Sequence, residues 1–381
     1  MSRALLFLFC CVVTFATADD RPNIIMIMAD DLGAETIGAY GALDYKTPVL
    51  DKMASEGLKF DRAYSTPLCN PTRVQLMTGR YTHRNYVKFG LFPSGEKTFG
   101  NLLKGAGYAT CMVGKWQLGG DHQTPHELGF DEYCLQNGIR PEKPFDRKTR
   151  GRERFWGYPV IVANGELYES EETYGPDMLN EYARDFVRRK SEAPFFLYYP
   201  MILPHSPFAP TPKSKDGDKS GAPISEVKYF GDMVEYIDHL VGNLLSTLDE
   251  EGIRDNTLVL FTGDNGTTYP VKVTAPAPEG FAKVDGINGA RHLSQLPPEK
   301  QPTPKEGFEG PLTRNGSDLI PGGKDLMSHR GVHVPLIVDW PKHRETYAKV
   351  ENQNAGLVDF TDFLTTFVEL AEADLPEDRI Q

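Results

Sequence analysis

Short apolar runs recur along the chain and are separated by longer amphipathic blocks. The first run covers residues 24–29, and a continuous run of this kind is typical of a strand buried on both faces of a parallel sheet. Four further runs, over 108–113, 195–199, 257–262 and 334–338, predict strands of the same type. We therefore expect a central sheet whose strands are mostly hidden from solvent.

The amphipathic blocks between these runs predict helices. Thr47 before Pro48 is a typical helix start and Gly57 a typical stop, while Thr98 is expected to cap a second helix that ends at Gly107. Four more helices are expected, over about 72–77, 177–190, 227–248 and 357–370. Alternation of strands with helices predicts an α/β fold in which a large, mostly parallel sheet is sandwiched by helices.

Two polar stretches interrupt this alternation and are expected to be surface insertions. Residues 136–174 are rich in charge, and residues 267–323 are rich in proline and glycine. Long loops inside a compact domain are usually functional, so 267–323 is predicted to cover the substrate side of the molecule. Aromatic residues in or before it are candidates for stacking on a sugar or aryl ring, with core packing as the alternative: Trp156, Tyr158, Tyr269 and Phe281.

The N-terminus has the pattern of a secretory signal peptide. Arg3 precedes an apolar run over 4–15, which ends in small residues at 16–18. The run is shorter than the roughly 20 residues that span a bilayer. We therefore expect residues 1–18 to be removed, residues 19–381 to form the mature domain, and the protein to be secreted or periplasmic without a membrane span.

The charge of the chain restricts its partners. It has 381 residues, with 41 lysines and arginines against 53 aspartates and glutamates, which gives a formal net charge of −12. Nucleic-acid binders need a basic face for phosphate contacts, so no nucleic-acid partner is expected. An anionic substrate would have to be bound by a local group of cations.

Polar residues follow directly after the predicted strands, where ligands bind in a doubly wound sheet. Asp30, Asp31, Asp264 and Asn265 offer oxygen donors of the kind that Ca²⁺ and Mg²⁺ prefer. Lys115, Gln117 and His205 follow two other strands, and of these Lys115 and His205 would supply positive charge across the crevice. Such a combination of a metal with cations suits a pocket that stabilises oxyanions.

Cys69 is the candidate nucleophile. Three cysteines remain after the predicted leader, and Cys111 lies in an apolar run that indicates a small core residue. Cys69 is expected at a helix N-terminus beside Arg73, which would stabilise a thiolate.

The segment around Cys69 also resembles a known signature. Cys-x-Pro-x-Arg at 69–73, followed by Leu-x-Thr-Gly-Arg at 76–80, is similar to the signature of the type I sulfatases of the alkaline phosphatase superfamily. Five other segments resemble boxes of that family in the same order: 22–33, 114–119, 204–207, 261–266 and 323–335. The resemblance covers nearly all of 19–381 and implies a sulfatase catalytic domain with an alkaline phosphatase-like fold.

The resemblance implies a role for each of these residues. Cys69 would be oxidised by a formylglycine-generating enzyme, and the aldehyde hydrate would attack the sulfur of a sulfate ester. Ca²⁺ would be held by Asp30, Asp31, Asp264 and Asn265 beside residue 69. Arg73 would neutralise the hydrate and anchor the metal site. The sulfate oxygens and the leaving oxygen would be bound by Lys115, Lys324 and His205, with Gln117 also at the substrate.

Three features depart from the family pattern. Gln117 replaces a histidine that serves as a proton acceptor, and glutamine cannot take a proton at neutral pH. His83 and His122 are candidate replacements. Arg330 and His333 alter the segment after Lys324. The usual small C-terminal subdomain is expected to be missing or truncated, because the chain stops at Gln381 just after the closing helix.

The favoured function is hydrolysis of a sulfate ester, of a sulfated carbohydrate in preference to a small aryl sulfate. Two alternatives remain open at this point. A phosphoester or phosphonate ester hydrolase could use a closely related pocket on the same fold. A non-catalytic protein that binds sulfated glycans would account for Gln117 and the early stop.

Overall fold

A computed structural model describes residues 19–136, 160–168, 174–216, 226–268, 312–315, 318–347, 353–354 and 356–377. The predicted leader 1–18, most of the 267–323 insertion and the four candidate stacking aromatics lie outside these residues. Within the described part of the chain, none of the helices combines the length and the apolar character that crossing a membrane requires.

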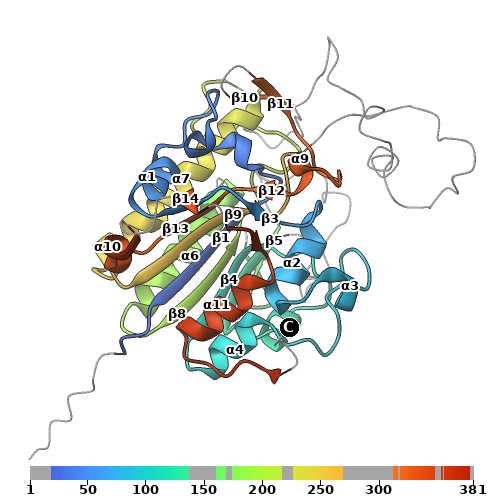
Figure 1. The fold of residues 1–381 in the computed structure, drawn as a ribbon. Coiled ribbons are helices and arrows are strands. Elements are labelled where there is room, and N and C mark those ends of the chain that lie inside the picture. Colours follow the sequence, from blue (N-terminus) through green and yellow to red (C-terminus); the bar gives the residue numbers. More distant parts are fainter. Residues whose placement is uncertain are drawn as a thin grey trace, which may run out of the picture.

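A ten-stranded sheet forms the centre of the fold (Figure 1). The strands are, in spatial order, β14 (Gln353–Asn354), β2 (Leu58–Phe60), β13 (Leu336–Asp339), β9 (Thr257–Gly263), β1 (Asn23–Ala29), β8 (Phe195–Pro200), β4 (Ala109–Lys115), β5 (Glu132–Gln136), β6 (Ile161–Ala163) and β7 (Glu166–Tyr168). The five strands from β9 to β5 are parallel to one another, whereas β13, β6 and β7 pair in the antiparallel sense. The α/β prediction with a mostly parallel sheet is therefore confirmed.

Helices cover both faces of this sheet (Figure 1). On one face Ile25 and Ile27 of β1 pack with α1 (Pro48–Glu56), α6 (Gly175–Lys190) and α7 (Tyr229–Glu250). On the other face Ile24, Met26 and Met28 pack with α2 (Cys69–Thr78), α4 (Phe99–Gly105) and α11 (Asp362–Leu370). Successive side chains of a strand point to opposite faces, so a strand covered on both sides has to be apolar throughout.

Smaller elements surround the central sheet. Two small sheets pair β10 (Leu312–Asn315) with β11 (Asp318–Pro321), and β3 (Ala63–Tyr64) with both β12 (His333–Val334) and β15 (Val358–Asp359). The short helices are α3 (Thr82–Asn85), α5 (Thr124–Glu127), α9 (His329–Val332) and α10 (Arg344–Tyr347), with 3₁₀ turns at Ala34–Thr36, Gly38–Tyr40 and Pro341–His343.

Several predicted boundaries are wrong for local reasons. The closing helix begins at Asp362 and not at 357, because Val358 and Asp359 pair with β3. The run 334–338 is split at Pro335, which has no N–H to donate, so it contributes to two sheets. Strands β6 and β7 extend the main sheet inside the stretch that was predicted to be an insertion.

Candidate active site

Strand register brings the predicted metal ligands together. Strands β1 and β9 are parallel neighbours with Ala29 opposite Gly263, so Asp30 and Asp264 leave the sheet side by side. The amide of Asp31, in left-handed conformation at φ 69°, donates to Asp264 Oδ1 at 3.0 Å. Asn265 Nδ2 donates to Asp31 Oδ1 at 2.9 Å. All four side chains are fully buried.

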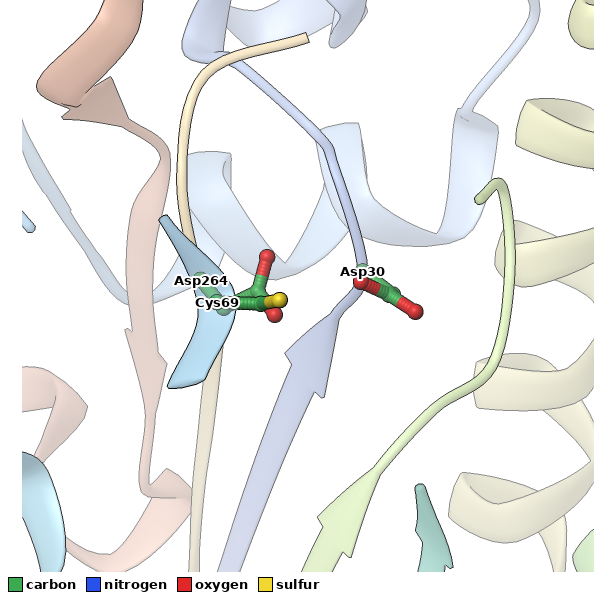
Figure 2. Close-up of side chains that lie close together, drawn as sticks. All are labelled: Asp30, Cys69 and Asp264. Carbon is green, nitrogen blue, oxygen red and sulfur yellow. The ribbon is translucent and has the colours of Figure 1, made fainter. Parts of the chain in front are cut away.

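The donor set fits a hard divalent cation. Carboxylate oxygens of Asp30 and Asp264 and the sulfur of Cys69 lie within 4.8 Å of one another (Figure 2). Asn265 Oδ1 is buried without a hydrogen-bond partner, although Nδ2 of the same amide donates to two oxygens. A buried acceptor of this kind normally has a partner, and a cation at this point would supply one.

The electrostatics of the carboxylates also favour a bound cation. Burial and repulsion from Asp30 raise the pKa of Asp264 to about 6, in spite of the neighbouring guanidinium of Arg73. Burial would by itself raise the pKa of Asp31, but Lys324 and His205 outweigh it and hold that pKa below its ordinary value. A divalent ion would relieve the repulsion that closely spaced carboxylates exert on one another.

Cys69 is the first residue of α2 and is 1% exposed. Helix α2 begins three residues earlier than predicted, because Pro71 fits the first turn, where its missing N–H costs nothing. The Cys69 thiol donates to Gln117 Oε1 at 2.9 Å, and burial raises the pKa of this thiol. The expectation of a stabilised thiolate is therefore wrong: desolvation outweighs the nearby cations.

Arg73 anchors α2 to the sheet. Its guanidinium is fully buried and donates to Asp264 Oδ2 from Nε at 3.2 Å and from Nη2 at 2.8 Å. Nη1 donates to the carbonyl of Lys115 at 3.1 Å, and Lys115 Nζ donates to Asp30 Oδ1 at 2.7 Å. These contacts join α2 to the ends of three strands, β9, β4 and β1.

Lys324 and His205 form the more accessible margin of the site. Lys324 Nζ lies 2.7 Å from Asp31 Oδ1 and 2.8 Å from Oδ2, which places the residue where the family resemblance predicts. His205 Nδ1 donates to the carbonyl of Ser206 at 2.7 Å, and Nε2 lies 3.7 Å from Asp31 Oδ2. Their side chains are 15% and 21% exposed, whereas that of Lys115 is fully buried.

Gln117 lies beside Cys69. Its left-handed backbone, at φ 52°, turns the side chain toward Cys69, and its carbonyl accepts from Asn70 Nδ2 at 2.7 Å. The two histidines that were candidates to replace the missing base contact other parts of the chain. His83, in α3, stacks on Tyr81, and His122 lies beside Gly165 in the turn between β6 and β7.

Two residues that position the site were not predicted. Thr267 Oγ1 donates to Glu35 Oε1 at 2.6 Å and accepts from the amide of Gly33 at 3.1 Å. The carbonyl of Thr267 also accepts from the amides of Gly323 and Lys324. Thr267 therefore joins both metal-ligand loops to Lys324. No sequence pattern marked Glu35 or Thr267, because the residues that they contact are distant along the chain.

The sequence matches the family model described as Sulfatase over residues 22–373. The chain belongs to the sulfatase family. Sulfatases generally use a formylglycine and a divalent metal, and the site around Cys69 has the residues for both.

Named sulfatases are similar over nearly the whole chain. N-acetylgalactosamine-6-sulfatase of Rattus norvegicus is 32% identical, with 96% of this chain and 65% of the relative covered. N-acetylgalactosamine-6-O-sulfatase of Bacteroides thetaiotaomicron is 28% identical, with 94% and 74% covered. The crystal structure of Ps i-CgsB is 28% identical with a TM-score of 0.68 and the same coverage. The chain thus spans about two thirds of the length of the mammalian relatives that it matches.

Proposed function

We propose that this sulfatase-family chain hydrolyses the sulfate esters of a sulfated carbohydrate, using a formylglycine formed from Cys69 and a bound calcium ion. The observation that carries this proposal is the position of Cys69. Its sulfur lies within 4.8 Å of carboxylate oxygens of Asp30 and Asp264, which are paired with the buried cations Lys115 and Arg73. A sulfate ester is an anion and needs local positive charge, which the acidic chain as a whole does not provide.

When both groups are in place, the aldehyde hydrate supplies the nucleophilic hydroxyl and calcium polarises a sulfate oxygen. The residues of the chain orient and neutralise the substrate around them. Lys115 and Lys324 both point to the carboxylate cluster and would bind the equatorial sulfate oxygens. His205, with Nδ1 held by a carbonyl and Nε2 directed toward Asp31, would deliver a proton from Nε2 to the leaving alcohol oxygen.

A carbohydrate substrate is supported by the relatives. Two of them carry names that specify N-acetylgalactosamine 6-sulfate esters, and Ps i-CgsB has also been solved in complex with k-i-k-neocarrahexaose. The predicted leader would place the protein outside the cytoplasm, secreted or periplasmic, where polymeric sulfated glycans occur. Maturation would then require a formylglycine-generating enzyme as a transient partner.

A substrate panel tests this function. The full chain, co-expressed with a formylglycine-generating enzyme, is assayed with 4-nitrophenyl sulfate, 4-nitrophenyl phosphate and bis(4-nitrophenyl) phosphate, with and without a calcium chelator. We expect calcium-dependent hydrolysis of the sulfate ester, at least tenfold faster than that of either phosphate. Faster hydrolysis of a phosphate ester would overturn the sulfatase assignment in favour of the alternative hydrolase.

Thr267→Val is expected to weaken calcium binding. The substitution removes the hydroxyl that links Glu35 to the Gly33 amide, and two hydrogen bonds of about 1 kcal/mol each predict a loss of affinity of roughly tenfold or more. Calorimetric titration with calcium measures the effect, and Thr268→Val serves as the control at the next position. Equal affinities for Thr267→Val and the control would contradict this role.

Gln117→His is expected to accelerate turnover. The side chain at 117 touches residue 69, and a histidine there would provide a proton acceptor that glutamine lacks. General base catalysis typically contributes about 10²-fold or more, so we expect kcat to rise by at least tenfold, with a new ionisation near pH 6.5 in its pH profile. Gln117→Asn, which adds no base, is the control. An unchanged kcat and pH profile would show that another group already accepts the proton.

A further inference from the structure

Residues 62–95 contain no aspartate or glutamate, although acidic residues outnumber basic ones in the whole chain. The same stretch contains five lysines and arginines, of which Arg73 is part of the active site. The other four are Arg62, Arg80, Arg84 and Lys88. A local excess of positive charge in an acidic protein is the feature that attracts an anionic partner.

Within this stretch, residues 81–89 form what we call the basic strip. Arg84 and Lys88 are exposed, and neither is paired with a carboxylate in the part of the chain that the structure describes. Tyr81, Val87 and Phe89 lie between and beside them and are 41%, 62% and 51% exposed. Exposed aromatic rings next to free cations are costly to leave in water and are a common way of binding charged sugars or rings.

The segment that follows the basic strip packs against the loop beside Cys69. Helix α3, within the strip, lies beside α2 and follows its C-terminal end, whereas Cys69 is the first residue of α2 (Figure 1). Three residues after the strip, the amide of Phe92 donates to the carbonyl of Leu118 at 2.8 Å. Leu118 directly follows Gln117, which touches the nucleophile.

Gly119 allows the two loops to approach each other. It has φ 74°, and a Cβ atom there would lie 2.7 Å from the carbonyl oxygen of Gly90. Only a glycine at 119 therefore permits Gly90, which directly follows the basic strip, to pack against the loop that carries Gln117.

A cavity of about 610 Å³ adjoins this contact. It is lined on one side by the segment 91–97 and on the other by residues of 118–128. Phe92 and Pro93 contribute apolar surface, and Ser94, Asn101 and Thr124 contribute polar atoms. The charged residues of the lining are Glu96, Lys97 and Glu127, so the cavity itself is not basic and the positive charge comes from the strip. This mixture of an apolar floor and scattered hydroxyl and amide groups suits a sugar ring.

We propose that the basic strip and this cavity bind the sulfated glycan chain on one side of the sugar whose sulfate is cleaved. The inference rests on the proposed function, because it assigns the flanking part of the same substrate. Arg84 and Lys88 pair with sulfate groups of neighbouring sugars, and the exposed rings of Tyr81 and Phe89 stack on their apolar faces. The site thereby selects a polymer over an isolated sulfated monosaccharide.

Charge reversal tests the proposal. Arg84→Glu with Lys88→Glu is compared with Arg84→Lys with Lys88→Arg, and with Lys104→Glu together with Lys342→Glu as a control of equal charge change. Lys104 and Lys342 lie at the opposite edge of the sheet, near Asp131 and Asp255 at the starts of β5 and β9. Binding of chondroitin sulfate and ι-carrageenan chains by the full protein is measured at two salt concentrations, with desulfated chondroitin as the negative probe.

We expect the reversed pair to weaken binding of at least one sulfated chain by tenfold or more at low salt, with a smaller effect at high salt. The conservative pair and the control are expected to stay within threefold of the natural protein. The loss in kcat/KM on that chain should exceed the loss on 4-nitrophenyl sulfate by at least tenfold.

Equal loss in the control would overturn the inference, as would equal binding of desulfated chondroitin or of polyphosphate. If 4-nitrophenyl sulfate is hydrolysed but no sulfated chain depends on the strip, this inference fails and the proposed function stands. If chains bind through the strip but no sulfate ester is hydrolysed, the proposed function fails and the binding surface stands.

Discussion

Cys69→Ser is expected to lower the rate of sulfate release by on the order of 10⁴-fold, the scale on which removal of a catalytic nucleophile acts. Serine at this position keeps a hydroxyl beside the cation cluster, but a single hydroxyl cannot collapse to an aldehyde and expel the bound sulfate. The expected result is a slow enzyme that accumulates a covalent sulfate on residue 69. Initial rates with 4-nitrophenyl sulfate and the mass of the intact protein measure both effects.

Cys134→Ala is the matched control. Cys134 is a free, fully buried cysteine in β5, and its substitution removes a sulfur from the core without changing the active site. Activity of this control should remain within a few-fold of the natural protein. A Cys69→Ser enzyme that turned over at the natural rate would contradict the assignment of residue 69 as nucleophile.

Asp264→Asn is expected to lower activity by about 10³-fold or more while changing the stability of the metal-free protein only slightly. Two effects oppose each other in the metal-free state. Arg73 loses the charge of its carboxylate partner, which destabilises the fold, but the repulsion from Asp30 is relieved. The pKa of Asp264, raised to about 6, shows that without a cation its ionised form is less favourable in the folded protein than in the unfolded chain.

The raised pKa of Asp264 makes the stability of the metal-free protein depend on pH. A carboxyl whose pKa is higher in the folded state binds its proton more tightly there, so the contribution of Asp264 to stability falls as the pH rises through about 6. Bound calcium should offset this loss of stability in the natural protein. The free energy of unfolding is expected to rise by about 2.7 kcal/mol when the calcium concentration is a hundred times the Kd. Thermal unfolding should show that gain in the natural protein and lose it in Asp264→Asn. An equal calcium-induced shift in both proteins would contradict a metal site at Asp264.

Much of the active site was predictable because parallel strands end at the same edge of the sheet. The apolar run 24–29 and the run 257–262 mark buried strands, and their register brings Asp30 and Asp264 together as expected. Lys324 could not be placed in this way, because it follows the predicted insertion and none of the predicted strands; strand β11 (Asp318–Pro321), which precedes it, was not predicted. The family resemblance predicted Lys324 as a site residue. In the structure, its backbone amide donates to the carbonyl of Thr267, which holds it beside the metal-ligand loops.

What could not be predicted depends on contacts between distant residues. The pKa of Cys69 follows from its burial, which the sequence of α2 alone does not reveal. Glu35 lies in a 3₁₀ turn, and its contact to Thr267 joins residues more than two hundred positions apart. The start of α11 was predicted too early, because the pairing of Val358 with β3 competes with helix formation.

The peptide that carries residue 69 provides the most direct test of the proposed chemistry. Its mass is determined in preparations made with and without a formylglycine-generating enzyme, and each preparation is assayed with 4-nitrophenyl sulfate before and after calcium removal. We expect the rate to be proportional to the fraction of peptide that carries an aldehyde in place of the thiol, to vanish with chelation and to return with calcium. If protein whose residue 69 is entirely an unmodified thiol hydrolysed 4-nitrophenyl sulfate as fast as the modified protein, the proposed formylglycine chemistry would be contradicted.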